Sequence, residues 1–365
     1  MLGRYKLLHK SISFFVLFIL VISFFNIEIC VAKDGNTLYV GGTSDGNYTT
    51  IQSALDNAGN NDTIYVYNGT YYEKLIIDKS INLIGSEKSS TIIDGNGGLY
   101  VIFIKSSWVN VSHFTITNGA MGIYTSDFNY SFNKITNNIF QNNSEGIRLY
   151  YSCNNKITDN VFKYHGDHGV ILHSSSNNSL MTNAFIDNYK AVSFGGWSYY
   201  NIISGNNFSD NTYCINLEYS FNNFIIGNYI LSNSRGITLS YSNGNNVTNN
   251  EIKENYQCGI YLINSDDNII SPNNYSHNGQ NVKTDPRPPV INIPGFEFLL
   301  IFVHFYLSCS SEKNIFDEIV CFAQIINKMW YFLCIMMIIC GNLLRSKRLN
   351  LSVILFYSLK YYPNL

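Results

Sequence analysis

The feature that most constrains this chain is a register that recurs every 22 to 24 residues between Gly122 and Asn278. Each of seven units opens on a small residue followed by an aliphatic one and closes on Asn-x-aromatic or Asn-x-Ile. A period this short cannot enclose a core, so each unit must be one coil that stacks on the next. The small residues are Gly122, Gly146, Gly169, Ala191, Cys214, Gly236 and Gly259, and the closing asparagines are Asn138, Asn160, Asn183, Asn206, Asn228, Asn250 and Asn273.

Within a unit the apolar residues alternate, as Ile147 and Leu149 do, and this is the period of a strand. A second strand in each unit is predicted to supply the core residues Ile157, Leu180, Ile202, Ile225, Val247 and Ile269. A third strand follows the closing asparagine. Three short strands between Asn, Gly and Ser turns predict an all-β fold, a parallel β-helix with triangular coils about 4.8 Å apart.

The recurrent asparagines form two columns, because a second Asn follows the first by five residues in six of the seven units. Asparagine tolerates left-handed backbone conformations and hydrogen-bonds within its own turn. Stacked asparagine side chains also bond along a column, as they do in cross-β ladders. We therefore interpret these columns as structural ladders and not as ligands.

Residues 1–32 have the pattern of a signal peptide. Lys6, His9 and Lys10 precede an uncharged run over 11–25, and Cys30-Val31-Ala32 offers a cleavage site. The pattern predicts an exported, extracellular or cell-surface protein. A retained N-terminal anchor is the alternative.

Composition excludes several classes of protein. Lys and Arg total 23 against 25 Asp and Glu, so no positive charge attracts nucleic acid. The repeats hold three cysteines, of which Cys214 and Cys258 lie two coils apart, roughly 9 to 10 Å, too far for a disulfide. Met121, Met181 and these cysteines are too scattered to predict a copper site. We expect no metal or cofactor, although calcium is considered below.

The stretch from Leu38 to Gly95 resembles a known family. It runs through Leu38-Tyr39-Val40-Gly41-Gly42, then Asp62-Thr63-Ile64-Tyr65-Val66, and ends on Thr91-Ile92-Ile93-Asp94-Gly95. This is similar to the opening of the pectin-lyase-like right-handed parallel β-helices, in particular the NosD-like surface proteins. The resemblance covers residues 33–280 and implies a cap with the first coils over 33–98 and the repeats over 99–280. Residues 50–58 would form a short amphipathic helix that closes the open end of the stack.

After the repeats, residues 281–293 are a Pro-rich linker, and 294–365 form a C-terminal segment. Pro294-Gly295-Phe296 resembles archaeal sorting signals that precede a membrane segment. The apolar run over 298–307 is only about half the roughly 20 residues that span a bilayer, and the second apolar stretch, 319–344, contains Lys328. Either a frameshift near 300–310 has altered the tail, or 329–344 is a real anchor. Both alternatives favour attachment to a membrane.

The densest group of ionisable residues is the turn that holds His165, Asp167 and His168. His165 occupies a position where the other six units have Asn. Together these side chains could bind a metal or move protons as a catalytic group. His173 lies about 16 Å further along an extended strand and should not converge with them. A solvated turn is the alternative.

Asp187 and Asp210 form a second candidate catalytic pair. Each stands four residues after the recurrent Asn, so they should stack on adjacent coils about 5 Å apart. That separation suits a retaining glycosidase or a calcium site. The same column continues with Ser232, Glu254 and His277, so a polar exterior turn is the alternative.

The third candidate site is aromatic. Tyr151, Tyr219 and Tyr241 share one exterior column, and Trp197 lies beside it. Aromatic rows can hold sugar rings through their apolar faces while hydroxyl groups supply hydrogen bonds. Stacked tyrosines that merely stabilise the sheet are the alternative.

These observations predict an exported, surface-anchored β-helix that binds carbohydrate or serves as a structural component of the cell envelope. Its expected partners are a polysaccharide or glycan and, through the C-terminal segment, a membrane. A polysaccharide hydrolase or lyase is one alternative function, and an adhesin that binds protein partners is another. The fold alone cannot decide among them.

Overall fold

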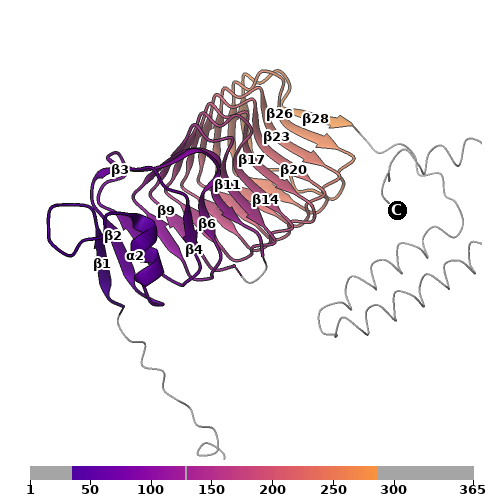
Figure 1. The fold of residues 1–365 in the computed structure, drawn as a ribbon. Helices are drawn as coiled ribbons and strands as arrows, with labels where there is room; N and C mark the ends of the chain where they lie inside the picture. The colour runs from indigo at the N-terminus through magenta and orange to yellow at the C-terminus, as the bar shows by residue number, and fades with distance from the viewer. Residues whose placement is uncertain (1–34, 128–129, 286–365) are drawn as a thin grey trace, which may run out of the picture. The chain divides into compact units, whose positions relative to one another are not determined.

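The computed structural model describes residues 35–127 and 130–285. They form a stack of coils, each built from three short strands and the turns between them (Figure 1). All strand pairings are parallel, for example Ile147 with Val170 and Leu149 with Leu172. The predicted right-handed parallel β-helix is therefore confirmed.

The strands line three faces. The first face contains β1 (Thr37–Val40), β2 (Thr63–Val66), β5 (Asn82–Gly85), β7 (Asn110–Ser112), β9 (Lys134–Thr136), β12 (Lys156–Thr158), β15 (Ser179–Met181), β18 (Ile202–Ser204), β21 (Phe224–Ile226) and β24 (Asn246–Thr248). The second contains β3 (Gly69–Tyr71), β10 (Ile139–Gln141), β13 (Val161–Lys163), β16 (Ala184–Ile186), β19 (Asn207–Ser209), β22 (Tyr229–Leu231), β25 (Glu251–Lys253) and β27 (Asn274–Ser276). The third contains β4 (Leu75–Ile77), β11 (Glu145–Tyr150), β14 (His168–His173), β17 (Lys190–Gly195), β20 (Tyr213–Glu218), β23 (Arg235–Ser240), β26 (Cys258–Ile263) and β28 (Val282–Asp285). The long strands β6 (Thr91–Ile104) and β8 (Thr115–Thr125) pair with both the second and the third face.

Inward-facing side chains stack into apolar columns along the axis. Phe140, Phe162, Phe185 and Phe208 follow one another with ring centroids 4.8 Å apart and nearly parallel planes. This spacing is the strand spacing itself, so each coil buries its aromatic ring against the next. The predicted core column after the closing asparagine is confirmed.

Two residues that we assigned to the second core column lie elsewhere. Ile202 and Ile269 are exposed, and their neighbours Ile203 and Ile270 face the core. In these coils a pair of isoleucines follows the asparagine, and alternation allows only one of them to point inward. The register of Leu180 with Ile203 selects the second residue of the pair.

The two predicted asparagine ladders are confirmed, and the described residues contain a third ladder. Asn206 Oδ1 accepts hydrogen bonds from the backbone N–H of Asn183 at 2.9 Å and from Asn183 Nδ2 at 3.0 Å. Asn206 Nδ2 in turn donates to Leu180 O and to the next asparagine of the ladder. Each buried amide is thereby satisfied by the neighbouring coil. The ladder that our sequence analysis missed contains Asn133, Asn155, Asn178, Asn201, Asn223, Asn245 and Asn268.

The predicted capping helix is α2 (Ile51–Asn57), which lies at the β1 end of the stack (Figure 1). Thr50 caps its N-terminus by accepting a hydrogen bond from Ser53 N. The Glu73 carboxylate accepts two more, from the N–H groups of Ile51 and Gln52. The buried face of the helix covers apolar side chains that would otherwise meet water at the first coil.

Contacts divide the chain into the unit Met1–Pro288, which includes every described residue, and the unit Pro289–Leu365. The predicted signal peptide, most of the linker and the C-terminal segment lie outside the described residues. Within 35–127 and 130–285, no helix is long and apolar enough to cross a membrane.

Candidate functional site

Three groups of exterior side chains correspond to the candidates from the sequence. We call the first the charged cluster, which consists of Glu145, Arg148, Asp167, His168 and Lys190. The second is the polar corner, the turns between the second and third faces that carry Asp187 and Asp210. The third is the aromatic corner, the turns between the third and first faces, over residues 106–108, 130–132, 151–155, 174–178, 197–201, 219–223 and 241–245.

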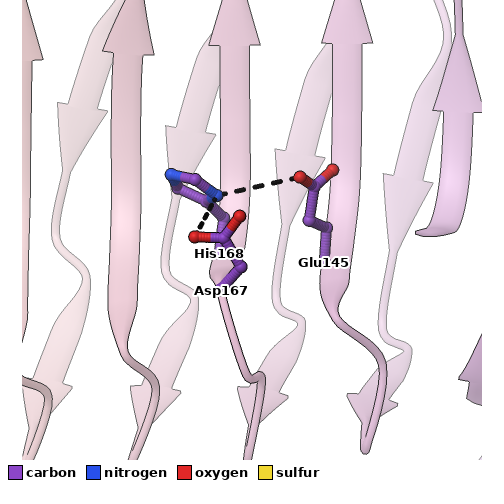
Figure 2. Close-up of side chains that lie close together, drawn as sticks. All are labelled: Glu145, Asp167 and His168. Carbon is purple, nitrogen blue, oxygen red and sulfur yellow. Dashed lines mark ion pairs between the residues drawn. The ribbon is translucent and has the colours of Figure 1, made fainter. Parts of the chain in front are cut away.

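In the charged cluster, His168 lies between two carboxylates (Figure 2). His168 Nδ1 is 3.1 Å from Asp167 Oδ1 and 3.8 Å from Glu145 Oε1. Glu145 comes from the preceding coil, where it begins β11 opposite His168 at the start of β14. Our sequence analysis missed Glu145, although its position directly before Gly146 matches that of His168 before Gly169.

Two cations balance these carboxylates. Arg148 Nε donates to Glu145 Oε2 at 2.6 Å, and Arg148 Nη2 contacts Glu145 Oε1. Lys190 Nζ, one coil further on, lies 3.4 Å from His168 Nε2 and 3.9 Å from Asp167 Oδ1. An ammonium group only donates, so we assign the imidazole proton of His168 to Nδ1, on the side of the carboxylates.

Glu145 is buried yet ionised. Burial opposes the charge, but the nearby His168 imidazole and the hydrogen bond from Arg148 overcome it and hold the pKa of Glu145 below its usual value. The bond to Glu145 raises the pKa of Arg148 in the same way. The cluster therefore combines the carboxylates of Glu145 and Asp167 with the cationic groups of Arg148 and Lys190 around the His168 imidazole.

His165 belongs to the same turn as His168 but faces the interior. Its backbone N–H donates to Asn188 Oδ1, and its Nδ1 lies 3.2 Å from Asn143 O, so it occupies the ladder position as predicted. Burial lowers its pKa to about 4. Its Nε2 has no hydrogen-bond partner among the described residues. The structure thus separates His165 from Asp167 and His168, and it brings Glu145 to the latter pair.

His173, at the far end of β14, contacts the ring of Tyr150 at 4.9 Å. It lies away from His165 and His168, as we expected from its distance along the strand.

Asp187 and Asp210 both lie exposed in the polar corner. Their backbones adopt the left-handed conformation and occupy equivalent positions, because Asp187 N–H donates to Ser209 O in the next coil. Within residues 35–127 and 130–285, neither carboxylate takes part in a hydrogen bond, an ion pair or a group of potential metal ligands. The pair has the predicted register, and its role in catalysis stays a prediction.

The aromatic corner has its densest group of rings around Trp197. Tyr219 and Tyr241 stack with centroids 5.0 Å apart and planes 9° apart, and each remains more than 40% exposed. Trp197 is 56% exposed and touches Phe221 at 6.3 Å, and Phe221 stacks on Tyr199 at 5.7 Å.

Trp197 projects because its turn is one residue longer than its neighbours. Ser174 aligns with Gly196, and Ser175 aligns with Ser198, so Trp197 is the inserted residue. Gly196 has a φ of 56°, and a Cβ there would lie 2.5 Å from the His173 ring, so this position needs glycine. The insertion therefore adds a large exposed ring without disturbing the ladder.

Tyr151 shares the column of Tyr219 and Tyr241, but it stands apart from them. Ser174 and Gly196 occupy the two intervening positions, and the Tyr151 ring packs on Tyr150 at 4.3 Å. The predicted row is therefore interrupted by two coils.

The aromatic corner also continues toward the N-terminus. Trp108 and Phe132, which our sequence analysis did not select, are exposed and stack at 4.6 Å with planes 8° apart. They occupy the position directly before the missed asparagine ladder, so the ladder would have identified them.

A protein-family model described as periplasmic copper-binding protein (NosD) matches residues 55–213 and 196–292, more than half of the chain. No curated protein matches the sequence. Among solved structures, an alginate lyase from Paenibacillus sp. str. FPU-7 is similar, with a TM-score of 0.51, 12% identity and coverage of 68% of this chain and 99% of that chain. Geobacillus virus E2 ORF18 has a TM-score of 0.48 and 14% identity, and the alignment covers 69% of this chain and 61% of that chain. At 12% identity the likeness to the alginate lyase shows the fold alone.

The described residues do not fit a copper site. Glu145, Asp167 and His168 form the one group of three potential ligands found in the described part of the chain. The group has no sulfur and only one imidazole, whereas copper favours thiolate, thioether and several imidazole ligands. Arg148 already binds Glu145, and Lys190 lies beside His168, so a metal ion there would meet two positive charges.

Proposed function

This chain belongs to the NosD family, and from that membership and its exterior we propose that it is an exported β-helix that binds carbohydrate through the aromatic corner. The observation that carries the proposal is the group of rings around Trp197, Tyr219 and Tyr241. Pyranose rings have apolar faces that pack on aromatic side chains and hydroxyl groups that bond to polar neighbours. The corner offers both, because its exposed rings include tyrosines with hydroxyl groups and the amide of Asn222 is exposed beside them.

A contrast within the fold supports this assignment. The turn over 174–178 contains only Ser and Asn, so the stack does not need aromatic residues at this corner. Exposed tyrosines also occur in the polar corner, but they are arranged differently. Tyr189 meets Tyr213 edge to face, and Tyr256 is 83% exposed. Parallel rings in successive coils are a feature of the aromatic corner.

Affinity electrophoresis of the full-length protein in gels that contain polysaccharide tests the proposal. We expect Trp197→Ala to weaken retention at least tenfold, since aromatic anchors at the centre of a binding surface dominate its energy. Tyr256→Ala is the control, because it removes an even more exposed ring from the polar corner. Equal retention of both variants and the wild-type protein would exclude the aromatic corner as the binding surface.

Membership in a family described as periplasmic agrees with export, and we propose attachment to the surface through residues 294–365. Flotation with lipid vesicles tests this attachment. The full-length chain should float with the vesicles, whereas a version that ends at Asp285 should remain in the soluble fraction. Flotation of both, or of neither, would contradict anchoring by the tail.

A second candidate function, polysaccharide cleavage, is favoured by the charged cluster. His168 has a carboxylate at Nδ1 and an ammonium group at Nε2, an arrangement that suits proton transfer. Chromatography of products after long incubation with polysaccharide would detect cleavage. If products form and His168→Ala does not abolish them, the cluster is not the catalytic site, and Asp187→Asn with Asp210→Asn is the next variant to examine.

A further inference from the structure

We infer that the ligand of the aromatic corner is an uncharged polysaccharide that lies along the axis of the β-helix. This inference rests on the proposed function and specifies the class of ligand. The inference is based on the positions of the charged side chains in the structure.

The aromatic corner is free of charged side chains over its central turns. Residues 151–155, 174–178, 197–201, 219–223 and 241–245 contain no Asp, Glu, Lys or Arg. The next turn, 264–268, contains Asp266 and Asp267, and no exposed ring. Aromatic residues and charges therefore exclude each other along this corner.

The surfaces that flank Trp197 and Tyr219 are also nearly uncharged. On the first face the adjoining outward residues are Ile202, Phe224 and Asn246, and the two apolar side chains are exposed. On the third face the adjoining residue of the Tyr219 coil is the exposed Glu218. A single carboxylate beside the rings would repel an acidic glycan.

The cations nearest to this region on the third face already have partners. Arg235 lies over the rings of Tyr213 and Tyr261, at 5.4 and 5.5 Å, and Lys283 lies over Tyr261 at 4.3 Å. Arg148 is bound to Glu145. On the first face, the exposed Lys134 and Lys156 follow the turns 130–132 and 151–155, so the cation-free part of the corner is the group of turns 197–201, 219–223 and 241–245. A polysaccharide with carboxylate or sulfate groups would lose hydration at these three turns without gaining an ion pair, which is a costly exchange. Sugar hydroxyl groups, by contrast, find the tyrosine hydroxyl groups and the exposed amide of Asn222 at these turns.

The direction of the ligand follows from the repeat. Exposed rings occur in the three successive turns 197–201, 219–223 and 241–245 at the coil spacing of about 4.8 Å, so they are arranged along the axis. A chain that lies along the axis contacts several turns, whereas a chain that crosses it contacts only one. Affinity should therefore rise with the number of sugar units until the ring-bearing turns are covered.

The test compares full-length protein in gels that contain neutral glucan, mannan or galactan with gels that contain alginate, at low and high NaCl. We expect retention by a neutral polysaccharide, unchanged by salt, and none by alginate. Stronger retention by alginate that salt abolishes would overturn this inference while leaving carbohydrate binding in place, because salt screens ionic contacts. Retention by no polysaccharide would instead refute the proposed function.

Glu218→Gln sharpens the test without threatening the fold, since Glu218 is exposed and the change is isosteric. Affinity for an uncharged ligand should stay within about twofold of the wild-type value. A severalfold rise would indicate an acidic ligand, and a severalfold fall a basic one, and either would overturn the inference.

Discussion

The asparagine ladders and the aromatic corner are built on the same coils but follow opposite rules. In the ladder, Asn183, Asn206 and Asn228 repeat one residue with the same hydrogen bonds in every coil. In the column of the aromatic corner, the equivalent residues are Tyr151, Ser174, Gly196, Tyr219 and Tyr241. The stack requires uniformity where coils must bond to one another, and it tolerates variety where side chains face water. Positions that vary from coil to coil are therefore where function can be placed.

One coil departs from uniformity in the interior as well. His165 replaces a ladder asparagine, and the same turn supplies Asp167 and His168 to the charged cluster. Substitutions in the ladder should therefore lower the free energy of unfolding most, substitutions in this coil less, and substitutions in the aromatic corner least.

The largest loss of stability is expected from Asn206→Ala in the middle of a ladder. The change removes the acceptor of two hydrogen bonds from Asn183 and the donor to Leu180 O and Asn228 Oδ1, all of them buried. Unsatisfied buried groups cost about 1–3 kcal/mol each, so we expect a total loss of about 3–5 kcal/mol. Chemical denaturation measures it, with Asn207→Ala, which alters an exposed neighbour, as the control. A loss below about 1 kcal/mol would show that water or neighbouring coils replace the ladder bonds.

Protonation of His165 is expected to lower the free energy of unfolding by up to about 3 kcal/mol as the pH falls. Its folded pKa of about 4 lies below the ordinary value of 6.5, so the unfolded chain binds more protons between these values. Stability from this residue is complete above pH 6.5 and is lost as the pH falls toward 4. His165→Asn should remove that dependence and restore the ladder.

The measurement for His165 is the free energy of unfolding at several pH values between 7 and 4. His277→Asn is the control, because His277 is exposed and asparagine also accepts its left-handed backbone. Parallel pH profiles for His165→Asn and the wild-type protein would contradict a neutral, buried imidazole.

Glu145→Gln should lower the free energy of unfolding by a smaller amount, about 2 kcal/mol. The substitution keeps the shape but loses the charge-assisted bond to Arg148 and the ionic contact with His168. Because these contacts lower the pKa of Glu145, its contribution is present above the ordinary value of 4.5 and disappears as the pH falls through the folded pKa. Thermal unfolding at pH 7 and at pH 3 should show a larger difference from the wild-type protein at the higher pH.

Glu251→Gln provides the comparison for that experiment. Glu251 pairs with Lys253 on an exposed strand, where ion pairs contribute little, so its loss should cost less than about 1 kcal/mol. Equal losses from both substitutions would mean that the charged cluster is an ordinary surface ion pair.

The sequence predicted the features that every coil repeats and missed those that depend on position within one coil. The period, the phenylalanine column and two ladders follow from residues that recur at fixed spacing, whereas the capping helix was predicted from the family resemblance of the N-terminal stretch. Ile202 and Ile203 could not be distinguished by hydropathy, and the choice was made by the register with Leu180. Glu145 and Trp108 were missed because their partners come from neighbouring coils.

The charged cluster illustrates the same limit. His165, Asp167 and His168 are close in sequence, yet the His165 side chain faces the interior, whereas Asp167 and His168 lie together beside Glu145. The chain bends at Gly166 and Asp167, and this bend separates the two directions. Sequence proximity within a β-helix turn is therefore weak evidence that side chains converge, whereas equivalent positions one repeat apart are strong evidence.

The smallest change in stability, less than about 1 kcal/mol, is expected from Tyr241→Ala in the aromatic corner. Its ring stacks on Tyr219 but is more than 40% exposed, so little buried area is lost. Retention by a neutral polysaccharide should nevertheless fall severalfold, because the ring belongs to the proposed binding surface. If instead the variant loses about 2 kcal/mol of stability and keeps its retention, the tyrosine stack is a structural device. In that case function would have to be placed elsewhere on the exterior, and the distinction between uniform and variable positions would not separate structure from binding.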